Sequence, residues 1–173
     1  MKRAAARFVA SGLGSGYAPV APGTVGSLVA MALGVAMLHL APAALPFAVI
    51  GATLAGLWSV RAAGVEDDPG WVVIDEFAGM WIAMLPMVSD AIAPGPVPLA
   101  LAFVSFRVLD ILKPGPVGWA DRQGGAAGVM ADDVIAGAIA AAVLWLASLA
   151  MPGLCMAGWD MAAWLGPSLG GNG

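Results

Sequence analysis

Two long stretches of this chain contain no Asp, Glu, Lys or Arg, and they restrict its fold more than any other feature. They run from Phe8 to Val60 and from Val134 to Trp159. A helix that crosses a bilayer needs about 20 consecutive apolar residues, so these stretches leave room for several spans. The composition agrees, because 61% of the residues are hydrophobic and 10% are charged, whereas soluble domains contain about 45–50% and about 25%. We therefore expect an all-α fold, a compact helical bundle that is embedded in a membrane through several spans.

Glycines and prolines divide the apolar sequence into helical segments. Helices are expected over residues 24–40, 44–62, 71–88, 96–112 and 132–151, with a further one over 154–166. Thr24 directly follows a Pro-Gly pair and has the side chain of a helix N-cap. No strand-like alternation competes with the helical pattern. Because no internal repeat or linker is present, residues 1–173 are expected to form a single domain with a disordered tail at 167–173.

The first residues of the chain combine basic and small side chains. Lys2, Arg3 and Arg7 surround a run of alanines, and glycines interrupt the apolar residues that follow. The core of a signal peptide therefore does not form, and we expect the segment to be retained. It is predicted to form an amphipathic helix at the membrane surface, with its cations against anionic headgroups. A frayed terminal tail is the alternative.

The basic residues are distributed as expected for one orientation in the membrane. Lys and Arg favour cytoplasmic loops. If five spans alternate from an N-terminus on the inner side, every basic residue falls on or near that side. These residues are Lys2, Arg3, Arg7, Arg61, Arg107, Lys113 and Arg122. The loops that would face the outer side carry no basic residue.

Three groups of carboxylates lie at the edges of the apolar segments. With alternating spans, all three would lie at the inner interface of the membrane. They are Asp75 with Glu76, Asp110, and Asp132 with Asp133. An ionised carboxylate in or beside hydrocarbon is costly unless it is paired, hydrated or bound to a metal, so such groups indicate a functional site. The alternation of spans would bring them together with Arg107, Lys113 and the glycine-rich turn Gly14–Ser27.

The charged residues of this cluster also have purely structural interpretations. Asp132 and Asp133 could cap a helix and complement its positive end. Arg107 and Asp110 are three residues apart and could form a simple salt bridge. Lys113 could extend its apolar stem and anchor its helix at the interface.

Glycines follow two of the carboxylates at helical spacing. Gly79 lies four residues after Asp75, and Gly137 lies four residues after Asp133. Each pair shares one face of a helix, so the small residue would let a ligand or another helix come close to the carboxylate. Tight helix packing is the structural reading of this pattern.

The residue types of the cluster suit a metal ion and a phosphate. Carboxylates bind a hard cation such as Mg²⁺ together with water and substrate phosphate. Arg107 could bind the phosphate through its planar guanidinium, and Lys113 could bind it as a point charge. The helix that follows the glycine-rich turn has free N–H groups at its N-terminus, where Thr24 and Ser27 are further candidate phosphate-binding residues. A purely structural turn is the alternative there.

Other kinds of chemistry are disfavoured. His39 is the sole histidine and lies in an apolar helix toward the predicted outer side, where packing explains it. Cys155 lacks the downstream arginine of thiol phosphatases, and no nucleotide-binding P-loop ending is present. A net charge of −4 with 7 basic residues argues against nucleic-acid binding. Metal-activated water, with a carboxylate as base, is the chemistry that remains.

Four segments of the chain carry a resemblance to a known family. The strings GSGYAPVAPGTVGS, IDEFAGMWIA, FRVLDILKPGPVGWADR and GVMADDVIAG occur in this order within residues 12–142. Together they resemble the phosphatidylglycerophosphatase A family. The resemblance implies an all-α, Mg²⁺-dependent lipid phosphatase of the bacterial inner membrane, with its active site facing the cytoplasm. Such an enzyme would remove the terminal phosphate of phosphatidylglycerophosphate to give phosphatidylglycerol and, downstream, cardiolipin.

The family motifs map onto residues of this chain one by one. The resemblance implies that the catalytic and metal-binding acids are Asp75, Glu76, Asp110, Asp132 and Asp133, and that Arg107 and Lys113 hold the phosphate. The chain departs from the family pattern at 121–128, which is slightly shorter than usual and has Ala126 in place of an expected glycine. Roles for Arg122, Gly124 and Gly125 are therefore left open.

The resulting hypothesis is the hydrolysis of a lipid phosphomonoester at the cytoplasmic interface, with membrane lipids around the helices and one of the five carboxylates as base. The alternative is a transporter or ion-coupled carrier, in which intramembrane acids relay protons or cations. If the protein were a carrier, its acids should lie near the bilayer midplane, with further partner residues along the path that the protons or cations take. A non-catalytic scaffold is a third interpretation, and it predicts Mg²⁺-independent folding without phosphate release.

Overall fold

The computed structural model describes residues 2–65, 69–89, 92 and 94–151, and the chain is all-helical within them. The α-helices are α1 (Lys2–Ala10), α2 (Pro22–Leu40), α3 (Ala44–Ala63), α4 (Ile74–Met84), α5 (Pro96–Leu112), α6 (Pro116–Asp121) and α7 (Gly125–Ala150), and the short 3-10 helices are η1 (Ser15–Tyr17) and η2 (Leu85–Val88). The all-α prediction is confirmed. The helix expected over 154–166 and the tail at 167–173 lie outside the described residues.

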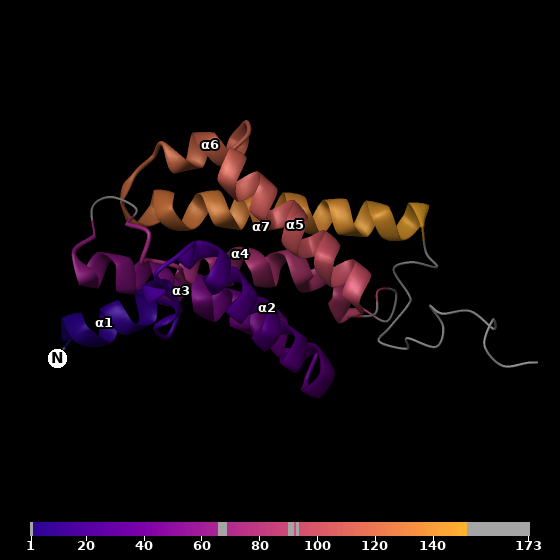
Figure 1. Ribbon diagram of the computed structural model, residues 1–173, viewed down its shortest axis with the longest axis horizontal. Helices are drawn as coiled ribbons and strands as arrows, with labels where there is room; N and C mark the ends of the chain where they lie inside the picture. The colour runs from indigo at the N-terminus through magenta and orange to yellow at the C-terminus, as the bar shows by residue number, and fades with distance from the viewer. Residues whose placement is uncertain (1, 66–68, 90–91, 93, 152–173) are drawn as a thin grey trace, which may run out of the picture.

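Helix α4 forms the centre of the bundle. It packs against α7, α3, α2 and α5, and Figure 1 shows it between α7 and α5 on one side and α2 and α3 on the other. Nine of its 11 residues are buried. A helix that is apolar nearly all round is stable only when other helices cover it, and α4 begins with its two acids, so this packing takes Asp75 and Glu76 into the protein interior.

Three helices among the described residues are long and apolar enough to cross a membrane, rather than the five expected. They are Pro22–Leu40, Ala44–Ala63 and Gly125–Ala150. Helix α4 has only 11 residues and rises roughly 16 Å at 1.5 Å per residue, about half the thickness of the hydrocarbon core. The prediction of five spans joined Trp71 to Val88 into one helix, whereas residues 71–73 precede α4 and 85–88 form η2. The other helix that was expected to span, α5, has 17 residues, fewer than the about 20 that a span needs.

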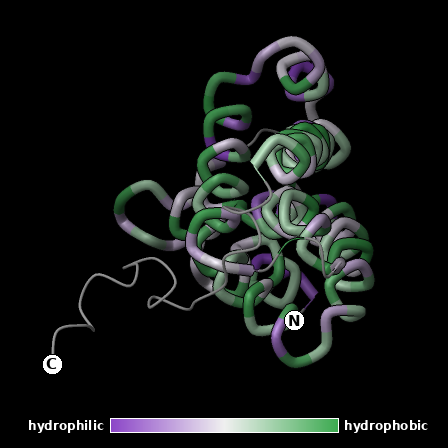
Figure 2. The backbone as a smooth tube through the Cα atoms, turned by 90° about the vertical axis from the view of Figure 1, so that its right-hand side faces the viewer, coloured by the Kyte–Doolittle hydropathy of each residue, from purple (hydrophilic) through white to green (hydrophobic). Residues whose placement is uncertain are grey.

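The long helices expose large hydrophobic side chains. On α2, α3 and α7 these include Leu28, Leu33, Leu40, Phe47, Ile50, Leu54, Trp58, Trp145, Leu146 and Leu149. Figure 2 shows hydrophobic residues on all sides of the helices rather than along a single stripe. Soluble proteins rarely expose such continuous apolar surface, and the apolar helices therefore indicate membrane association.

Two helices begin earlier than the sequence predicted. Helix α2 starts at Pro22, whose fixed φ suits the first helical position, and Ala21 is the N-cap with a φ of 47°. Thr24 consequently lies inside the first turn, so its prediction as an N-cap is wrong. Helix α7 starts at Gly125 after Gly124, and both glycines have a positive φ that turns the chain.

The early start of α7 changes the position of its acids. Asp132 and Asp133 lie inside the helix and are 4% and 3% exposed, whereas the prediction placed them at its first turn. The capping interpretation of this pair is therefore wrong. Ala126, Ala127 and Ala131 precede the acids and are strong helix formers, which explains why the helix extends in this direction despite the glycines.

Helix α6 was not anticipated, and it links α5 to α7. Lys113 ends α5 in the left-handed region, with a φ of 46°, and Pro114 follows it. Gly118 then passes close to the end of α5, since a Cβ at this glycine would lie 2.4 Å from the carbonyl oxygen of Lys113. The tight turn folds α6 back onto α7 and keeps the Lys113 side chain near the acids of α7.

The N-terminal segment is helical, as predicted, rather than frayed. In α1, Ala6 and Ala10 are buried while Lys2 and Arg3 are exposed, and the helix packs against α3. The backbone N–H of Val73 donates a hydrogen bond of 2.9 Å to the carbonyl oxygen of Ala10. This bond ties α1 to the residue directly before α4.

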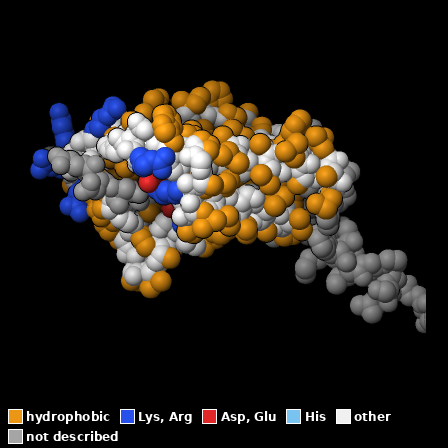
Figure 3. Space-filling model, turned by 90° about the horizontal axis from the view of Figure 1, so that it is seen from above, with side chains coloured by type: hydrophobic (Ala, Val, Ile, Leu, Met, Phe, Trp, Pro, Cys, Tyr) orange, Lys and Arg blue, Asp and Glu red, His pale blue; other side chains and the backbone are white. Residues whose placement is uncertain are grey.

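Lys and Arg side chains gather at one end of the molecule on the face shown in Figure 3, and hydrophobic side chains are spread over the remainder. In Figure 1 the same end contains α1, the end of α3, the beginnings of α4 and α7, and α6. The five predicted acids lie on the first turn of α4, the last turn of α5 and the early turns of α7. The expected meeting of distant helix ends therefore occurs.

Candidate active site

Helices α4 and α7 cross closely at two glycines. A Cβ at Gly137 would lie 2.3 Å from the carbonyl oxygen of Gly79, and a Cβ at Gly79 would lie 2.7 Å from the carbonyl oxygen of Asp133. Any side chain at either position would force the backbones apart. The glycines that follow Asp75 and Asp133 in sequence thus pack the two helices together, and this contact brings the acids of α7 to those of α4.

Three carboxylates from three helices converge at this crossing. Oxygen atoms of Glu76 on α4, Asp110 on α5 and Asp133 on α7 lie within 4.8 Å of one another. Glu76 and Asp133 are buried, and Asp110 is half-buried. Carboxylate oxygens at this spacing are the ligands that hard divalent cations prefer, so the donor set fits such an ion.

Arg107 lies beside the three carboxylates. Its Nη1 is 2.5 Å from Oε2 of Glu76 and 2.6 Å from Oδ2 of Asp110. The Arg107 side chain is 13% exposed, and its buried Nε has no hydrogen-bond partner among the residues that the structure describes. A buried donor of this kind costs free energy unless a ligand or water accepts its hydrogen bond, so Arg107 has unused capacity to bind an anion.

The beginning of α2 closes the site from a fourth side. Oγ of the buried Ser27 lies 2.7 Å from Oε2 of Glu76 and 2.8 Å from the carbonyl oxygen of Gly23, and its single proton can serve one of them at a time. Nη1 of Arg107 donates to the same Oγ at 3.3 Å. A Cβ at position 23 would lie 2.3 Å from Oε1 of Glu76. Gly23 therefore lets the helix start approach the acids.

Burial and charge repulsion weaken the acidity of Glu76. Burial, followed by the negative charge of Asp110, raises the pKa of Glu76 from 4.5 to about 7, although Arg107 and Ser27 act in the opposite direction. The pKa of Arg107 is raised, because attraction to Glu76 and Asp110 outweighs the effect of burial. One guanidinium thus does not compensate the acids fully, and a divalent cation among them would supply the missing positive charge.

A second ion-paired group lies at the entry of α7. Nζ of Lys113 is 2.7 Å from Oδ2 of Asp132 and also pairs with Asp121 on α6. These partners raise the pKa of Lys113 even though burial opposes the shift. Lys113 is therefore not a free interfacial anchor. Asp132, which was predicted beside the other ligands, turns its Oδ2 toward this lysine.

The other predicted residues lie at the margin of the carboxylate cluster. Asp75 is 6% exposed, and its Oδ1 accepts a hydrogen bond of 2.9 Å from the backbone N–H of Glu76. Thr24 is half-buried in the first turn of α2. Asp121 was not among the predicted site residues, since its pairing with Lys113 depends on the short helix α6. The family string that ends in Trp-Ala-Asp-Arg was the sequence signal for it.

Comparison with known proteins identifies the family. The family model described as phosphatidylglycerophosphatase A matches residues 8–148. The chain belongs to the phosphatidylglycerophosphatase A family. It is 37% identical over 139 residues to phosphatidylglycerophosphatase A of Escherichia coli, covering 78% of each chain, and 36% identical over 141 residues to the Haemophilus influenzae protein of the same name, covering 77% of this chain and 82% of the relative.

A third relative carries a different substrate in its name. A Bacteroides thetaiotaomicron protein, named as a candidate phosphatidylinositol-3-phosphatase, is 36% identical over 146 residues, covering 75% of this chain and 85% of its own length. No solved structure matches the chain. Membership of the phosphatidylglycerophosphatase A family makes the chain a phosphatase, an enzyme of the lipid-phosphatase type. The predicted family, derived from four motifs, is confirmed.

Proposed function

We propose that this enzyme hydrolyses the terminal phosphomonoester of phosphatidylglycerophosphate in a Mg²⁺-dependent reaction that yields phosphatidylglycerol, the precursor of cardiolipin. The observation that carries the proposal is the convergence of Glu76, Asp110 and Asp133 within 4.8 Å next to an arginine with an unused buried donor. Metal ligands and a phosphate ligand side by side are what metal-assisted phosphomonoester hydrolysis requires.

The ion would be held first by Glu76, Asp110 and Asp133, because their oxygens lie closest together. Asp75 and Asp132 are the remaining candidate ligands, either for a second ion or as acids that orient the first set. A bound Mg²⁺ supplies positive charge against the phosphoryl oxygens and lowers the pKa of its water. The oxygen-only donor set supports Mg²⁺ over metals that prefer sulfur or nitrogen.

The protein residues would bind and orient the phosphate. Arg107 offers its Nε–H to a phosphoryl oxygen while Nη1 stays with Glu76 and Asp110. Thr24 and Ser27 lie in the first turns of α2, whose N–H groups favour an anion. Lys113 contributes its charge from the side of Asp132. Water attacks phosphorus, one of the carboxylates takes a proton from this water, and the same proton passes to the glycerol oxygen as its bond to phosphorus breaks.

The reaction would occur at the cytoplasmic surface of the bacterial inner membrane. The end of the molecule that carries the carboxylate cluster also carries the Lys and Arg side chains (Figure 3), and positive charge favours the cytoplasmic side. The apolar helices next to the cluster would keep the acyl chains of the substrate in the bilayer while its headgroup phosphate reaches the acids.

The test is a phosphate-release assay with the purified protein, phosphatidylglycerophosphate and Mg²⁺. We expect release with Mg²⁺, no release with chelator, and loss of turnover in Asp133→Asn and Asp132→Asn. Asp160→Asn is the matched control, because this carboxylate lies beyond the family match of residues 8–148. Unchanged turnover in Asp133→Asn, or full activity in chelator, would refute the proposed metal chemistry.

The name of the Bacteroides relative supplies one competing substrate. Phosphatidylinositol 3-phosphate should be assayed in parallel, and we expect the larger kcat/KM for phosphatidylglycerophosphate. A preference for the inositol lipid would reassign the headgroup and keep the phosphatase chemistry. Metal-dependent cation flux into liposomes without phosphate release from either lipid would favour the carrier alternative.

A further inference from the structure

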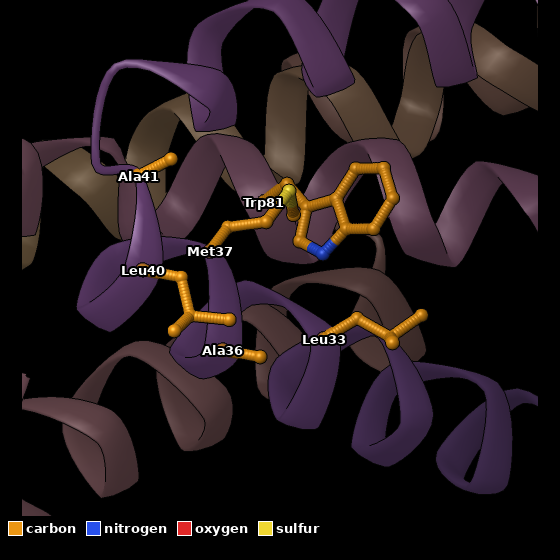
Figure 4. Close-up of a pocket in the computed structure, with 6 residues that line it drawn as sticks. All are labelled: Leu33, Ala36, Met37, Leu40, Ala41 and Trp81. Atoms are coloured by element: carbon orange, nitrogen blue, oxygen red, sulfur yellow. The ribbon is translucent and has the colours of Figure 1, made fainter.

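An apolar groove lies on the surface between α2 and α4. It has a volume of about 290 Å³ and is lined by Leu33, Ala36, Met37, Leu40, Ala41 and Trp81. Figure 4 shows the Met37 side chain directed toward Trp81, with Leu33 and Leu40 along the same helix. All six lining residues are hydrophobic, so a ligand of this groove must be apolar along the length that it inserts.

One wall of the groove is held in place from inside the protein. The indole Nε1–H of Trp81 donates a hydrogen bond of 2.7 Å to the carbonyl oxygen of Ala30, and the Trp81 ring packs edge-on against Phe77 with centroids 5.6 Å apart. A Cβ at Gly34 would lie 2.7 Å from Sδ of Met84 and 3.2 Å from Cδ1 of Trp81. The groove is thus preformed, and the indole nitrogen of Trp81, the one side-chain nitrogen or oxygen among its six described lining residues, is already bonded.

Both helices that form the groove begin at the carboxylate cluster. Helix α2 carries Ser27 near its start and Leu33 farther along, and α4 carries Glu76 before Trp81. At 1.5 Å per residue, Leu33 lies roughly 9 Å along α2 from Ser27, and Leu40 lies roughly 20 Å from it. A lipid with its terminal phosphate at the cluster has a glycerol phosphate linker next and its acyl chains beyond, at the level of the groove.

We propose that the groove binds one acyl chain of the lipid substrate. The inference rests on the proposed function and adds a second point of recognition to it. Helix α2 is long and apolar enough to cross the membrane, so the groove along it would open to the acyl region of the bilayer rather than to water. Moving a chain from lipid into this groove changes its surroundings little, so the groove orients the substrate more than it holds it.

The first test fills the groove. Ala36 is exposed, so Ala36→Trp adds a ring over the groove without entering the core, and Leu54→Trp, at a position 61% exposed on α3, is the matched control. For long-chain phosphatidylglycerophosphate we expect kcat/KM to fall roughly tenfold in Ala36→Trp, the low end of what a misfit in an apolar pocket causes. With the dihexanoyl substrate, whose chains are too short to fill the groove, kcat/KM should match that of wild type. Equal effects on both substrates, or none, would overturn the proposal.

A second test does not depend on turnover. Phosphatidylglycerol with a diazirine at the end of one acyl chain should photolabel residues 33–41 or Trp81 in wild type and in Leu54→Trp, and label these sites several-fold less in Ala36→Trp. Equal labelling in all three proteins, or crosslinks showing a second copy of the chain over the groove, would overturn the proposal. If wild type labels as expected and releases no phosphate, the proposed function fails and the acyl site stands.

Discussion

Arg107 shows how one side chain serves both the acids and the proposed substrate. It contacts Glu76 and Asp110 through Nη1, and its buried Nε has no partner within the described residues. A guanidinium has several N–H donors in one rigid plane, so one edge can pair with carboxylates while another faces an anion. A lysine could supply the charge but not this division of donors.

Arg107→Lys is therefore expected to lower kcat by about 10²-fold, the usual loss when one positioned donor to a developing negative charge is removed. The positive charge beside Glu76 is retained, so folding should persist. Phosphate release measures the first effect, and far-UV circular dichroism measures the second. A folded Arg107→Lys variant with wild-type kcat would show that only the charge matters.

Arg107 pairs with two of the three clustered carboxylates, and the repulsion that remains among the three would be relieved by a divalent cation. We expect Mg²⁺ at 100 times its Kd to raise the free energy of unfolding of wild type by about 2.7 kcal/mol, and Asp133→Asn to lose most of that gain. In chelator the order should reverse, because the variant lacks one of the repelling charges within 4.8 Å. Thermal unfolding in detergent, with and without Mg²⁺, measures both effects.

Asp121→Asn is the control for this experiment. Asp121 pairs with Lys113 and is not one of the three clustered acids, so its variant should keep the stabilisation by Mg²⁺. An equal loss in Asp121→Asn and Asp133→Asn would place the ion elsewhere. Absence of any Mg²⁺ effect on wild type would remove the metal from the proposal.

The helix crossing of α4 and α7 is the element-level contact that positions the acids. Gly79 and Gly137 let the two backbones touch, and Asp133 lies one turn before Gly137 on α7. A change in the separation of these helices therefore moves Asp133 relative to Glu76. Close packing of this kind transmits a displacement of the backbone because the interior has little free volume.

Gly137→Ala should destabilise the protein by about 1–3 kcal/mol, the usual effect of overpacking, and should lower activity even at temperatures where the variant is folded. Gly51→Ala is the matched control on α3, because within the described residues a Cβ at that position would meet no atom within 4 Å beyond the neighbouring backbone of its own helix. It should be neutral or stabilising by up to about 1 kcal/mol. Thermal unfolding and phosphate release check both variants. A Gly137→Ala variant as stable as Gly51→Ala would contradict the tight crossing.

The sequence predicted α2, α3 and α5 to within two residues, but it missed α6 and placed the start of the longest helix, α7, seven residues too late. Prolines and glycines bracket residues 44–62 and 96–112, and the corresponding helices end within a residue of these limits. Helix α6 is too short to show a periodicity, and the glycines before α7 hid its true start. Local pattern has little power where tertiary contacts decide the boundary.

The candidate site was predicted as a gathering of charges but not as a set of pairs. The sequence analysis let the spans alternate across the membrane, which placed Glu76, Asp110 and Asp133 at the same depth. That argument needed no knowledge of side-chain directions. The sequence did not predict that Asp132 and Asp133 have different partners. Adjacent residues on a helix point about 100° apart, and the direction of each depends on how α7 packs. Asp132 consequently faces Lys113, and Asp133 faces Glu76 and Asp110.

At the scale of the whole molecule, the charged side chains gather toward one end of the long axis. The carboxylate cluster and the basic side chains share one end (Figure 3), and the turn between α2 and α3 lies away from that end (Figure 1). Trp119 on α6 is 59% exposed at the charged end, and Ala43 is exposed in the α2–α3 turn. In the proposed orientation, these two positions would lie on opposite faces of the membrane.

In a Cys155→Ser background, Ala43→Cys should react with a membrane-impermeant thiol reagent in right-side-out vesicles, and Trp119→Cys should react only in inside-out vesicles. The physical reason is that basic residues are retained on the cytoplasmic side during insertion, which fixes the end that carries α6. Both variants should label equally after detergent solubilisation, which shows that each thiol is reactive. Labelling of Trp119→Cys from the outside would invert the orientation and would put the carboxylate cluster on the face opposite to the one proposed.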